Sequence, residues 1–235
     1  VERCQFDTVR MVMGINPDEF CWNLKAGDEF QAPEVVMVYS AEGLGEMTRS
    51  YHAFYRRHMI RSPYNHKKRP ILINNWEATY FNFNEEKILK IAEQAQKLGI
   101  EMLVLDDGWF GKREDDNSGL GDWFVNEKKM NGSMAQLAEK IHKMGMKFGL
   151  WFEPEMISED SDLYRAHPDW AFAIPGRVPN HSRNQLVLDM TREDVREYLL
   201  ERLTTIVHDA KIDYVKWDMN RSVCDVYSLS LIHIS

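Results

Sequence analysis

The sequence predicts an α/β protein that contains the first half of a (β/α)8 barrel, preceded by the end of a β domain. From residue 71 onward, four short apolar runs alternate with amphipathic stretches of helical spacing, which is typical of parallel βα units. Polar and aromatic residues follow each run, as in barrels, where the C-terminal strand ends meet at one site. No glycine-rich phosphate loop follows the first run, which disfavours a dinucleotide-binding sheet. Four units cannot close an eight-stranded barrel, so we expect the remaining units outside this chain.

Residues 1–61 are predicted to end a β domain and to lead into the barrel. Three apolar runs are bounded by Gly, Pro, Asn or Asp, a pattern typical of strands. These runs span residues 9–14, 20–24 and 35–39. Residues 44–60 have helical spacing, and the two Ser/Arg-Pro pairs within residues 62–70 predict a linker.

Residues 71–228 are predicted to form the barrel domain. The expected strands are residues 71–74, 102–105, 147–152 and 214–217. The expected helices are residues 85–98, 133–145 and 191–208. Asn84 and Ser133 are suited to begin the first two helices, and Gly99 and Gly145 to end them.

Composition excludes several classes of function. The 235 residues carry a formal net charge of -8, and the one basic run, residues 66–69, lies in the predicted linker, so we expect no nucleic-acid partner. No apolar stretch approaches the ~20 residues of a membrane span, and no signal-peptide pattern begins the chain. Three cysteines without Cys-x-x-Cys spacing fit a reducing compartment, so we expect a cytoplasmic protein with no membrane association.

The segment Tyr214-Val215-Lys216-Trp217-Asp218 contains the most informative residues. On a strand, Lys216 and Asp218 project from the same face. A carboxylate beside a cation stays ionised at neutral pH, the state that a nucleophile or an electrostatic stabiliser requires. The alternative is a surface ion pair worth ~1 kcal/mol or less. The segment alone leaves both interpretations open.

Carboxylates and tryptophans at the other strand ends indicate a carbohydrate site. Asp106 and Asp107 could bind a metal or accept hydrogen bonds from sugar hydroxyls, or simply support the following loop. No histidine pair has ligand spacing near a strand end, so we predict no metal and no cofactor. Tryptophans that could stack on a sugar stand at positions 76, 109, 123 and 151. Glu153 and Glu155 are candidate acids, although Pro154 between them favours structural support.

Four motifs together resemble the bacterial-type α-galactosidases of glycoside hydrolase family 36. They are Leu103-Val104-Leu105-Asp106-Asp107-Gly108-Trp109-Phe110, Gly149-Leu150-Trp151-Phe152-Glu153-Pro154-Glu155, Arg183-Asn184-Gln185-Leu186-Val187-Leu188-Asp189 and Tyr214-Val215-Lys216-Trp217-Asp218-Met219-Asn220-Arg221. The resemblance covers residues 71–228 and implies that residues 1–61 end the family's N-terminal β-sandwich domain.

The resemblance implies specific roles for individual residues. Asp218 would be the nucleophile of a retaining mechanism that hydrolyses terminal α-galactosyl residues of melibiose- or raffinose-type oligosaccharides. Asp106 and Asp107 would bind the hydroxyls that distinguish galactose. The remaining substrate-binding residues would be Trp76, Trp151, Arg183, Lys216, Trp217 and Asn220.

The resemblance also implies that this chain lacks part of the site. The family's acid/base aspartate lies on a later strand, so we expect the chain alone to be inactive. Residues 229–235 do not fit the family pattern and predict a truncated or foreign tail. For the parent protein, the resemblance leads us to expect a homo-oligomer whose only partner in catalysis is a small-molecule α-galactoside.

Three other functions remain open. An α-glucosidase of a related clan shares the Trp-x-Asp-Met-Asn setting, but Arg221 stands where those enzymes usually have an acidic residue. A galactosyltransferase similar to raffinose synthase would share the nucleophile and pocket. A non-catalytic sugar-binding fragment would bind galactose without turnover.

Overall fold

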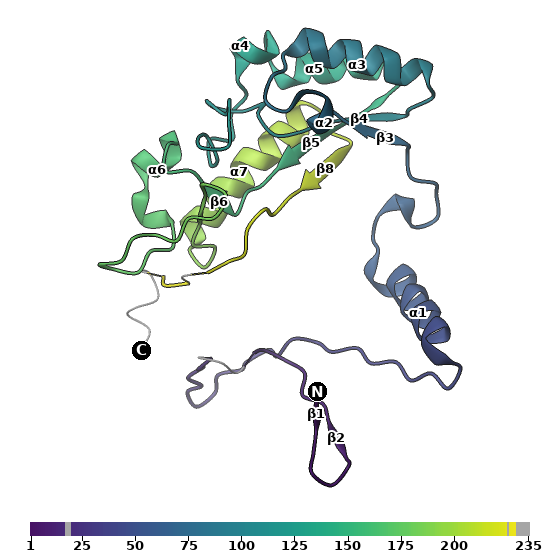
Figure 1. Cartoon of the computed structure of the whole chain (residues 1–235), viewed down its shortest axis with the longest axis vertical. Coiled ribbons are helices and arrows are strands. Elements are labelled where there is room, and N and C mark those ends of the chain that lie inside the picture. Colours follow the sequence, from purple (N-terminus) through teal and green to yellow (C-terminus); the bar gives the residue numbers. More distant parts are fainter. Residues whose placement is uncertain (17–19, 225, 229–235) are drawn as a thin grey trace. The chain divides into compact units, whose positions relative to one another are not determined.

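The computed structural model describes residues 1–16, 20–224 and 226–228 (Figure 1). The predicted tail, residues 229–235, lies outside the described residues. The chain divides into two compact units, Val1–Lys68 and Arg69–Ser235, and this boundary falls inside the predicted linker at residues 62–70.

The first unit contains the predicted helix but few of the predicted strands. Strands β1 (Glu2–Arg3) and β2 (Val9–Arg10) form a short antiparallel pair. Helix α1 (Gly43–Phe54) continues into a π-helical turn at Tyr55–Met59, which matches the helix predicted over residues 44–60. A 3-10 turn, Pro63–Asn65, occupies the predicted linker.

The strands predicted over residues 20–24 and 35–39 are wrong for the part of the unit that the structure describes. Those residues form neither helix nor strand, and the side chains of Trp22 and Tyr39 are 59% and 89% exposed. A β-prone sequence becomes a strand only when a neighbouring strand and a packed face stabilise it. None of the described residues in this unit is buried, so these runs lack such support here.

The second unit is built on a four-stranded parallel sheet. Its strands are β3 (Leu72–Asn74), β4 (Met102–Leu105), β5 (Lys147–Phe152) and β8 (Tyr214–Trp217), hydrogen-bonded in that order. In register, Leu105 lies opposite Leu150, and Trp151 lies opposite Lys216. All four are the predicted barrel strands, and an all-parallel sheet of consecutive strands is the arrangement that βα units produce.

Three helices connect these strands, as the sequence predicts. They are α3 (Glu85–Lys97), α5 (Met134–Lys143) and α7 (Glu193–Asp209). The Asn84 side chain accepts a hydrogen bond from the Lys87 amide, and Ser133 forms a reciprocal capping box with Gln136, which fixes where the first two helices begin. The apolar side chains of these helices join one continuous core with the central strands.

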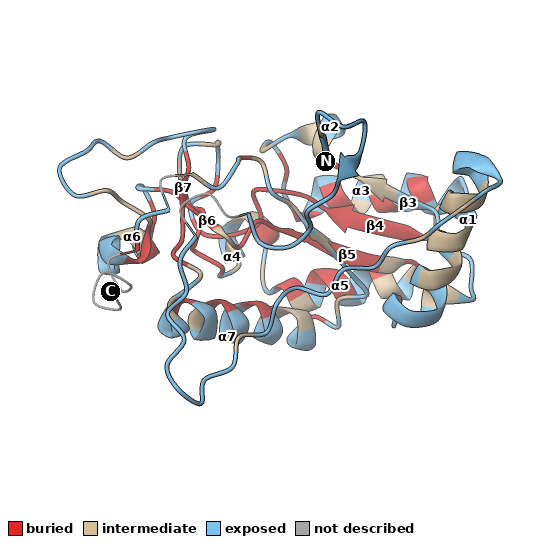
Figure 2. Cartoon of the chain, turned by 90° about the horizontal axis from the view of Figure 1, so that it is seen from below, coloured by how far each residue is buried: buried red, intermediate tan, exposed pale blue. Residues whose placement is uncertain are grey.

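Burial differs between the centre and the edges of the sheet. Every residue of β4 is buried, as is nearly all of β5 (Figure 2). No residue of β3 or β8 is buried, and most of β8 is exposed. Within the described residues, β3 and β8 each pair along one edge only. Parallel sheets normally have both faces covered, so the central strands β4 and β5 follow this rule and the two edge strands do not.

Several short elements have no counterpart among the predicted ones. They are α2 (Trp76–Thr79), α4 (Glu127–Met130), β6 (Met156–Ile157), α6 (Asp162–Ala166), a 3-10 turn at Pro168–Trp170 and β7 (Leu186–Val187). Strands β6 and β7 pair antiparallel. None of the described helices has the length and apolar character needed to cross a membrane.

We predict that Gly149→Ala destabilises the protein by about 1–3 kcal/mol, because the added methyl group overpacks the sheet centre. An added Cβ would lie 3.0 Å from side-chain atoms of both Val104 and Tyr214 and 3.2 Å from the Tyr214 carbonyl oxygen. Urea unfolding followed by tryptophan fluorescence measures the loss. Gly45→Ala, which approaches only the flexible end of Arg49, is the control and should not destabilise the protein. Equal stability of the wild type and the Gly149 variant would contradict this packing.

Candidate active site

The C-terminal ends of the four parallel strands bring the predicted polar residues together. Asn74 ends β3, Asp106 follows β4, Trp151 lies near the end of β5, and Lys216 lies in β8. Residues that are in register across a sheet point to the same face, and Trp151 is in register with Lys216. The strand ends therefore supply one cluster from segments that are more than 100 residues apart in the sequence.

Asp106 is the most extensively bonded carboxylate of this cluster. It is 3% exposed, and its Oδ2 accepts hydrogen bonds from Asn74 Nδ2 at 2.5 Å and Lys216 Nζ at 2.7 Å. Its own amide donates to Asn75 Oδ1 at 2.8 Å. The sequence suggested that Lys216 pairs with Asp218, its neighbour two residues away. In the structure the Lys216 cation is instead paired with Asp106.

Asp218 is held by neutral donors instead. Its Oδ2 accepts hydrogen bonds from Trp151 Nε1 at 3.0 Å and from Asn220 Nδ2 at 2.9 Å. Burial opposes ionisation of Asp218, but these two hydrogen bonds, the Met219 amide and the charge of Lys216 outweigh it, so the pKa of Asp218 lies below its ordinary value. Asp218 is therefore ionised at neutral pH. Among the groups named here that lower its pKa, the charge of Lys216 has the smallest effect.

Asp107 forms a buried ion pair with Arg113, a residue that the sequence analysis missed. Arg113 is 1% exposed, and its Nε and Nη2 donate to the Asp107 carboxylate at 3.0 and 2.8 Å. Burial raises the pKa of Asp107, and the hydrogen bonds and charge of Arg113 partly oppose this rise. Gly108 makes the turn possible, since at its φ of +102° a Cβ would lie 2.9 Å from the Phe81 ring.

Arg183 and Asn220 meet at the edge of the cluster. Arg183 Nη1 donates to Asn220 Oδ1 at 3.2 Å, although the two residues are 37 positions apart. Arg183 is exposed, and its φ of 53° is an uncommon backbone conformation for a residue other than glycine. This conformation sets the direction in which its side chain leaves the backbone. Asn220 therefore bonds both Arg183 and Asp218, and the sugar-binding role of these residues stays a prediction.

Trp76 and Trp217 have different positions relative to the cluster. Trp76 begins α2, its amide donates to Asn74 Oδ1 at 2.8 Å, and its half-buried ring makes edge contacts with Tyr80 and Phe81. Trp217 is in register with Phe152, so it lies on the opposite face of β8 from Lys216. With Phe152 it lines an apolar cavity of about 610 Å³ against α7, so the structure does not bring Trp217 to the cluster.

Comparisons with known proteins show the family of this chain. The sequence model of the melibiase family matches residues 29–233, most of the chain. The chain belongs to this family. A bifunctional α-galactosidase/sucrose kinase, AgaSK, from Mediterraneibacter gnavus is 54% identical over 98% of this chain and 25% of its own length. The α-galactosidase AgaA from Geobacillus stearothermophilus is 53% identical over 98% of this chain and 32% of its own length.

Solved structures of these α-galactosidases are similar to the chain. The structure described as glycoside hydrolase family 36 α-galactosidase AgaA from Geobacillus stearothermophilus gives a TM-score of 0.93, with 54% identity over 97% of this chain and 32% of that one. A variant of AgaA in complex with raffinose gives a TM-score of 0.90, with 52% identity over 94% of this chain and 31% of that one. The chain spans a quarter to a third of the length of these relatives.

Glu153 and Glu155, in the motif at residues 149–155, differ in burial, since Glu153 is buried and Glu155 is partly exposed. Glu153 has no exposed surface, and it accepts hydrogen bonds from the Asn220 amide and from Gln185. Burial and the nearby charges of Asp218 and Asp107 raise the pKa of Glu153, against the opposing hydrogen bonds from Asn220. Glu155 instead accepts from Trp217 Nε1 at 3.0 Å, on the side away from the cluster.

Arg221 is a buried residue that connects two segments next to the cluster. It is 6% exposed, and its Nη1 donates to the carbonyl oxygens of Asn180 and Gln185, while Nη2 lies 2.8 Å from Cys224 Sγ. Arg221 therefore ties the chain after β8 to the loop that carries Arg183. Its side chain is therefore bonded within the chain.

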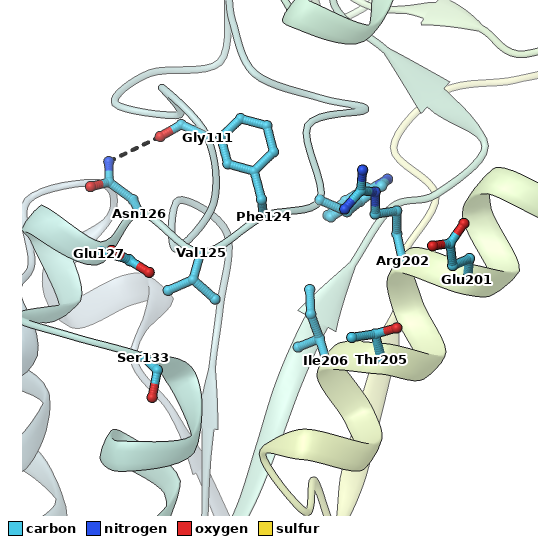
Figure 3. Close-up of a pocket in the computed structure, with 11 residues that line it drawn as sticks. Gly111, Phe124, Val125, Asn126, Glu127, Ser133, Glu201, Arg202, Thr205 and Ile206 are labelled. Atoms are coloured by element: carbon cyan, nitrogen blue, oxygen red, sulfur yellow. Dashed lines mark hydrogen bonds between the residues drawn. The ribbon is translucent and has the colours of Figure 1, made fainter.

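A second cavity lies away from the strand-end cluster (Figure 3). It encloses about 650 Å³ between the segment 123–127 and α7, with Asn126 bonded to the Gly111 carbonyl on one side and Arg202 on the other. Of the candidate sugar-binding residues, only Trp123 lines it, and Trp123 is 1% exposed. Among the described residues, no group of three or more His, Cys, Asp or Glu side chains is placed to hold a metal ion.

We predict that Arg113→Met destabilises the protein by about 3–5 kcal/mol, because it leaves the buried Asp107 carboxylate without its cation. Without Arg113 the pKa of Asp107 rises further above its ordinary value. The folded state then holds a proton that the unfolded state has released, so the variant loses stability as pH rises through the interval between the two pKa values. Urea unfolding between pH 4 and pH 8 measures both effects.

Two further variants complete this test. Adding Asp107→Asn to the Arg113 variant removes the buried charge and should recover part of the lost stability. Lys90→Met breaks an exposed ion pair with Glu86 and should change little. A loss of stability in the Arg113 variant that is no larger than in the Lys90 variant would contradict the buried pair.

Proposed function

We propose that this chain carries the nucleophile and most of the sugar-binding groups of a retaining α-galactosidase. The observation that carries the proposal is the environment of Asp218, a half-buried carboxylate kept ionised by hydrogen bonds from Trp151 and Asn220. The relatives support the substrate class, since they are named α-galactosidases and AgaA variants are described in complexes with raffinose and stachyose. The proposed substrates are therefore terminal α-galactosides of the raffinose type.

The residues around Asp218 fit the recognition of a galactosyl group. Asp106 and Asp107 present fixed carboxylates that can accept hydrogen bonds from sugar hydroxyls, and Lys216 and Arg183 supply donors. The ring of Trp76 is available for stacking against the apolar face of the sugar. Trp151 is 1% exposed and contributes its indole N–H to Asp218, so it orients the nucleophile.

In the proposed mechanism, an Asp218 oxygen attacks the anomeric carbon while the leaving oxygen takes a proton. The resulting galactosyl-enzyme ester is hydrolysed by water with a second inversion, so the configuration is retained. Such enzymes place the second carboxyl, the acid and later base, ~5–5.5 Å from the nucleophile. The hydrogen bonds that lower the pKa of Asp218 also make its carboxylate a good leaving group in the second step.

We propose that the acid/base carboxyl comes from a part of the protein outside this chain. Three carboxyl groups of the described cluster are candidates for the acid, but none of them is free to donate a proton to a substrate. Asp106 is bound to Lys216, Asp107 to Arg113, and Glu153 has no exposed surface. Strands β3 and β8, which pair on one side only within the described sheet, are where the remaining barrel strands would pair. A cytoplasmic homo-oligomer remains a prediction.

We predict that Asp218→Ala lowers kcat on the order of 10³-fold or more, because no covalent intermediate can form. The test uses the completed enzyme, in which residues 1–228 of this chain replace the matching segment of Geobacillus stearothermophilus AgaA. Release of nitrophenol from p-nitrophenyl α-galactoside measures turnover. Azide, acting as an external nucleophile in the vacated space, should restore cleavage and give a galactosyl azide of inverted configuration.

The matched control for this variant is Asp213→Asn in the completed enzyme. Asp213 lies just before the same strand, where it bonds Lys147 and His142 at the opposite end from the site. This variant should keep its turnover. Retention of more than a few per cent of activity by Asp218→Ala would remove Asp218 from the nucleophile role, and transfer to a sugar acceptor in place of hydrolysis would favour a galactosyltransferase.

We predict that the isolated chain binds galactose weakly and does not hydrolyse melibiose, because its hydroxyl-binding groups are present without an acid. Calorimetry with galactose and an assay of melibiose cleavage on the same preparation test both parts. Asp106→Asn, which weakens the Lys216 pair, should reduce the binding. Cleavage of melibiose by the isolated chain would show that the acid lies within it, because a sugar leaving group must be protonated whereas nitrophenolate can leave without an acid.

A further inference from the structure

Glu153 lies at the end of β5, beside the end of β8. Strand β5 carries Trp151, a hydrogen-bond donor to Asp218, and Asp218 itself follows β8. Glu153 is the first residue after β5, and none of its surface is exposed. Its Oε1 accepts a hydrogen bond from the Asn220 amide at 2.5 Å, and its Oε2 accepts one from Gln185 Nε2 at 3.3 Å. One buried carboxyl group thus joins the end of β5 to the turn after β8 and to the loop that follows Arg183.

The turn fixed by Glu153 contains the groups that set the geometry of Asp218. Asn220 Nδ2 donates to Asp218 Oδ2 at 2.9 Å, so a shift of the Asn220 backbone moves this donor. The Asp218 amide donates to the Phe152 carbonyl at 2.8 Å, which attaches the same turn to the residue before Glu153. Asp218 is therefore attached to β5 through its own backbone and, by way of Asn220, through the Glu153 side chain.

We propose that Glu153 is a positioning residue for the nucleophile, acting through the length of its side chain and its acceptor oxygen. The proposal rests on the proposed function of Asp218. Glu153 does not touch the substrate, because a carboxyl group without exposed surface cannot reach a glycosidic oxygen. Glu153 binds the backbone amide of Asn220 and so holds the Asn220 side chain where its Nδ2 can bond the attacking carboxylate of Asp218.

The alternative role for Glu153 is that of the general acid. A carboxyl group whose pKa is raised beside an ionised carboxylate has the protonation state that an acid needs. The two roles depend on different properties of the side chain. Positioning requires an acceptor at the right distance and tolerates loss of charge, whereas acid catalysis requires an ionisable group and fails without one.

The surroundings of Glu153 are suited to a glutamine in its place. Gln185 Oε1 is buried and makes no hydrogen bond to the described residues. If the Gln185 amide group rotates by half a turn, this oxygen can accept a hydrogen bond from the new amide nitrogen. The oxygen of the new side chain can still accept from the Asn220 amide, so Glu153→Gln preserves the bridge without the charge.

The experiment compares two substitutions in the completed enzyme. Glu153→Gln keeps the length and loses the charge, whereas Glu153→Asp keeps the charge and shortens the side chain by one methylene. We expect Glu153→Gln to keep kcat for p-nitrophenyl α-galactoside within about a factor of three of the parent. We expect Glu153→Asp to lower kcat roughly 10²-fold, with a much smaller change in KM, because the nucleophile is misplaced.

The control and a second measurement separate positioning from folding. Glu155→Gln alters the other glutamate of the motif, which bonds Trp217, and should leave kcat and KM unchanged. Thermal unfolding of every variant shows whether it is folded at the assay temperature. Covalent labelling of Asp218 by a slow fluorinated galactosyl substrate gives the rate of nucleophilic attack per folded molecule, so partial unfolding cannot imitate a positioning defect.

Each outcome has a distinct meaning. Near-parent kcat for Glu153→Gln with slow labelling for Glu153→Asp supports the proposal. Loss of kcat in Glu153→Gln, with azide restoring a product of retained configuration, would make Glu153 the acid and overturn it. Equal labelling rates in both variants, with only the melting temperature lowered, would reduce Glu153 to a structural role. Absence of turnover in the unsubstituted completed enzyme would contradict the proposed function itself.

Discussion

The ion pair between the buried Asp106 and the partly exposed Lys216 is the interaction on which the arrangement of the site depends. The two residues are 110 positions apart, and β5 lies between their strands, so the pair spans an intervening strand. Neighbouring strands are about 4.8 Å apart, so the contact requires both a long lysine side chain and a sheet that curves toward this face. Contacts between alternate strands on one face are also how side chains are layered inside barrels, which supports the proposed architecture.

The cost of burying Asp106 explains why its neighbours are so specific. A carboxylate that is 3% exposed loses nearly all its hydration, and only close donors with good geometry offset that loss. Asn74 and Lys216 bond one oxygen, and the Asp107 amide bonds the other at 2.9 Å. These donors come from β8 and from the segments at the ends of β3 and β4. A carboxylate with these partners holds the strand ends in one arrangement, and the proposed nucleophile, Asp218, lies two residues beyond Lys216.

The sequence predicted the elements that have their own local signal and missed those that depend on distant partners. The four barrel strands and three long helices follow from apolar periodicity, capping residues and glycine stops, which act within a few residues. Strands β6 and β7 are two residues each and exist because Met156 and Val187, 31 positions apart, pair with each other. The runs at 20–24 and 35–39 show the converse case, in which a strand-like pattern lacks the neighbours that would make it a strand.

The same distinction applies to the site residues. Motifs identified Asp106, Trp151 and Asp218, but their hydrogen-bond partners could not be identified from sequence spacing. Lys216 lies two residues from Asp218 and yet pairs with Asp106, because its long side chain reaches across β5 on the face of the sheet where Asp106 lies. Arg113 lies in a loop of mixed charge with nothing to distinguish it from its exposed neighbours. Trp217 is different, since alternation along the strand already places it on the face opposite Lys216 and Asp218.

Three carboxyl groups of the site differ in pKa for reasons that separate their roles. Asp218 retains partial exposure and three hydrogen-bond donors, so its pKa falls and its charge is available to a substrate. Asp107 and Glu153 are more deeply buried, and burial raises the pKa of each in spite of its donors. A raised pKa is often taken as the mark of a catalytic acid, but an acid must also reach the atom that it protonates. Glu153 has the raised pKa without the access, so its pKa reflects the burial that makes it a rigid support for Asn220.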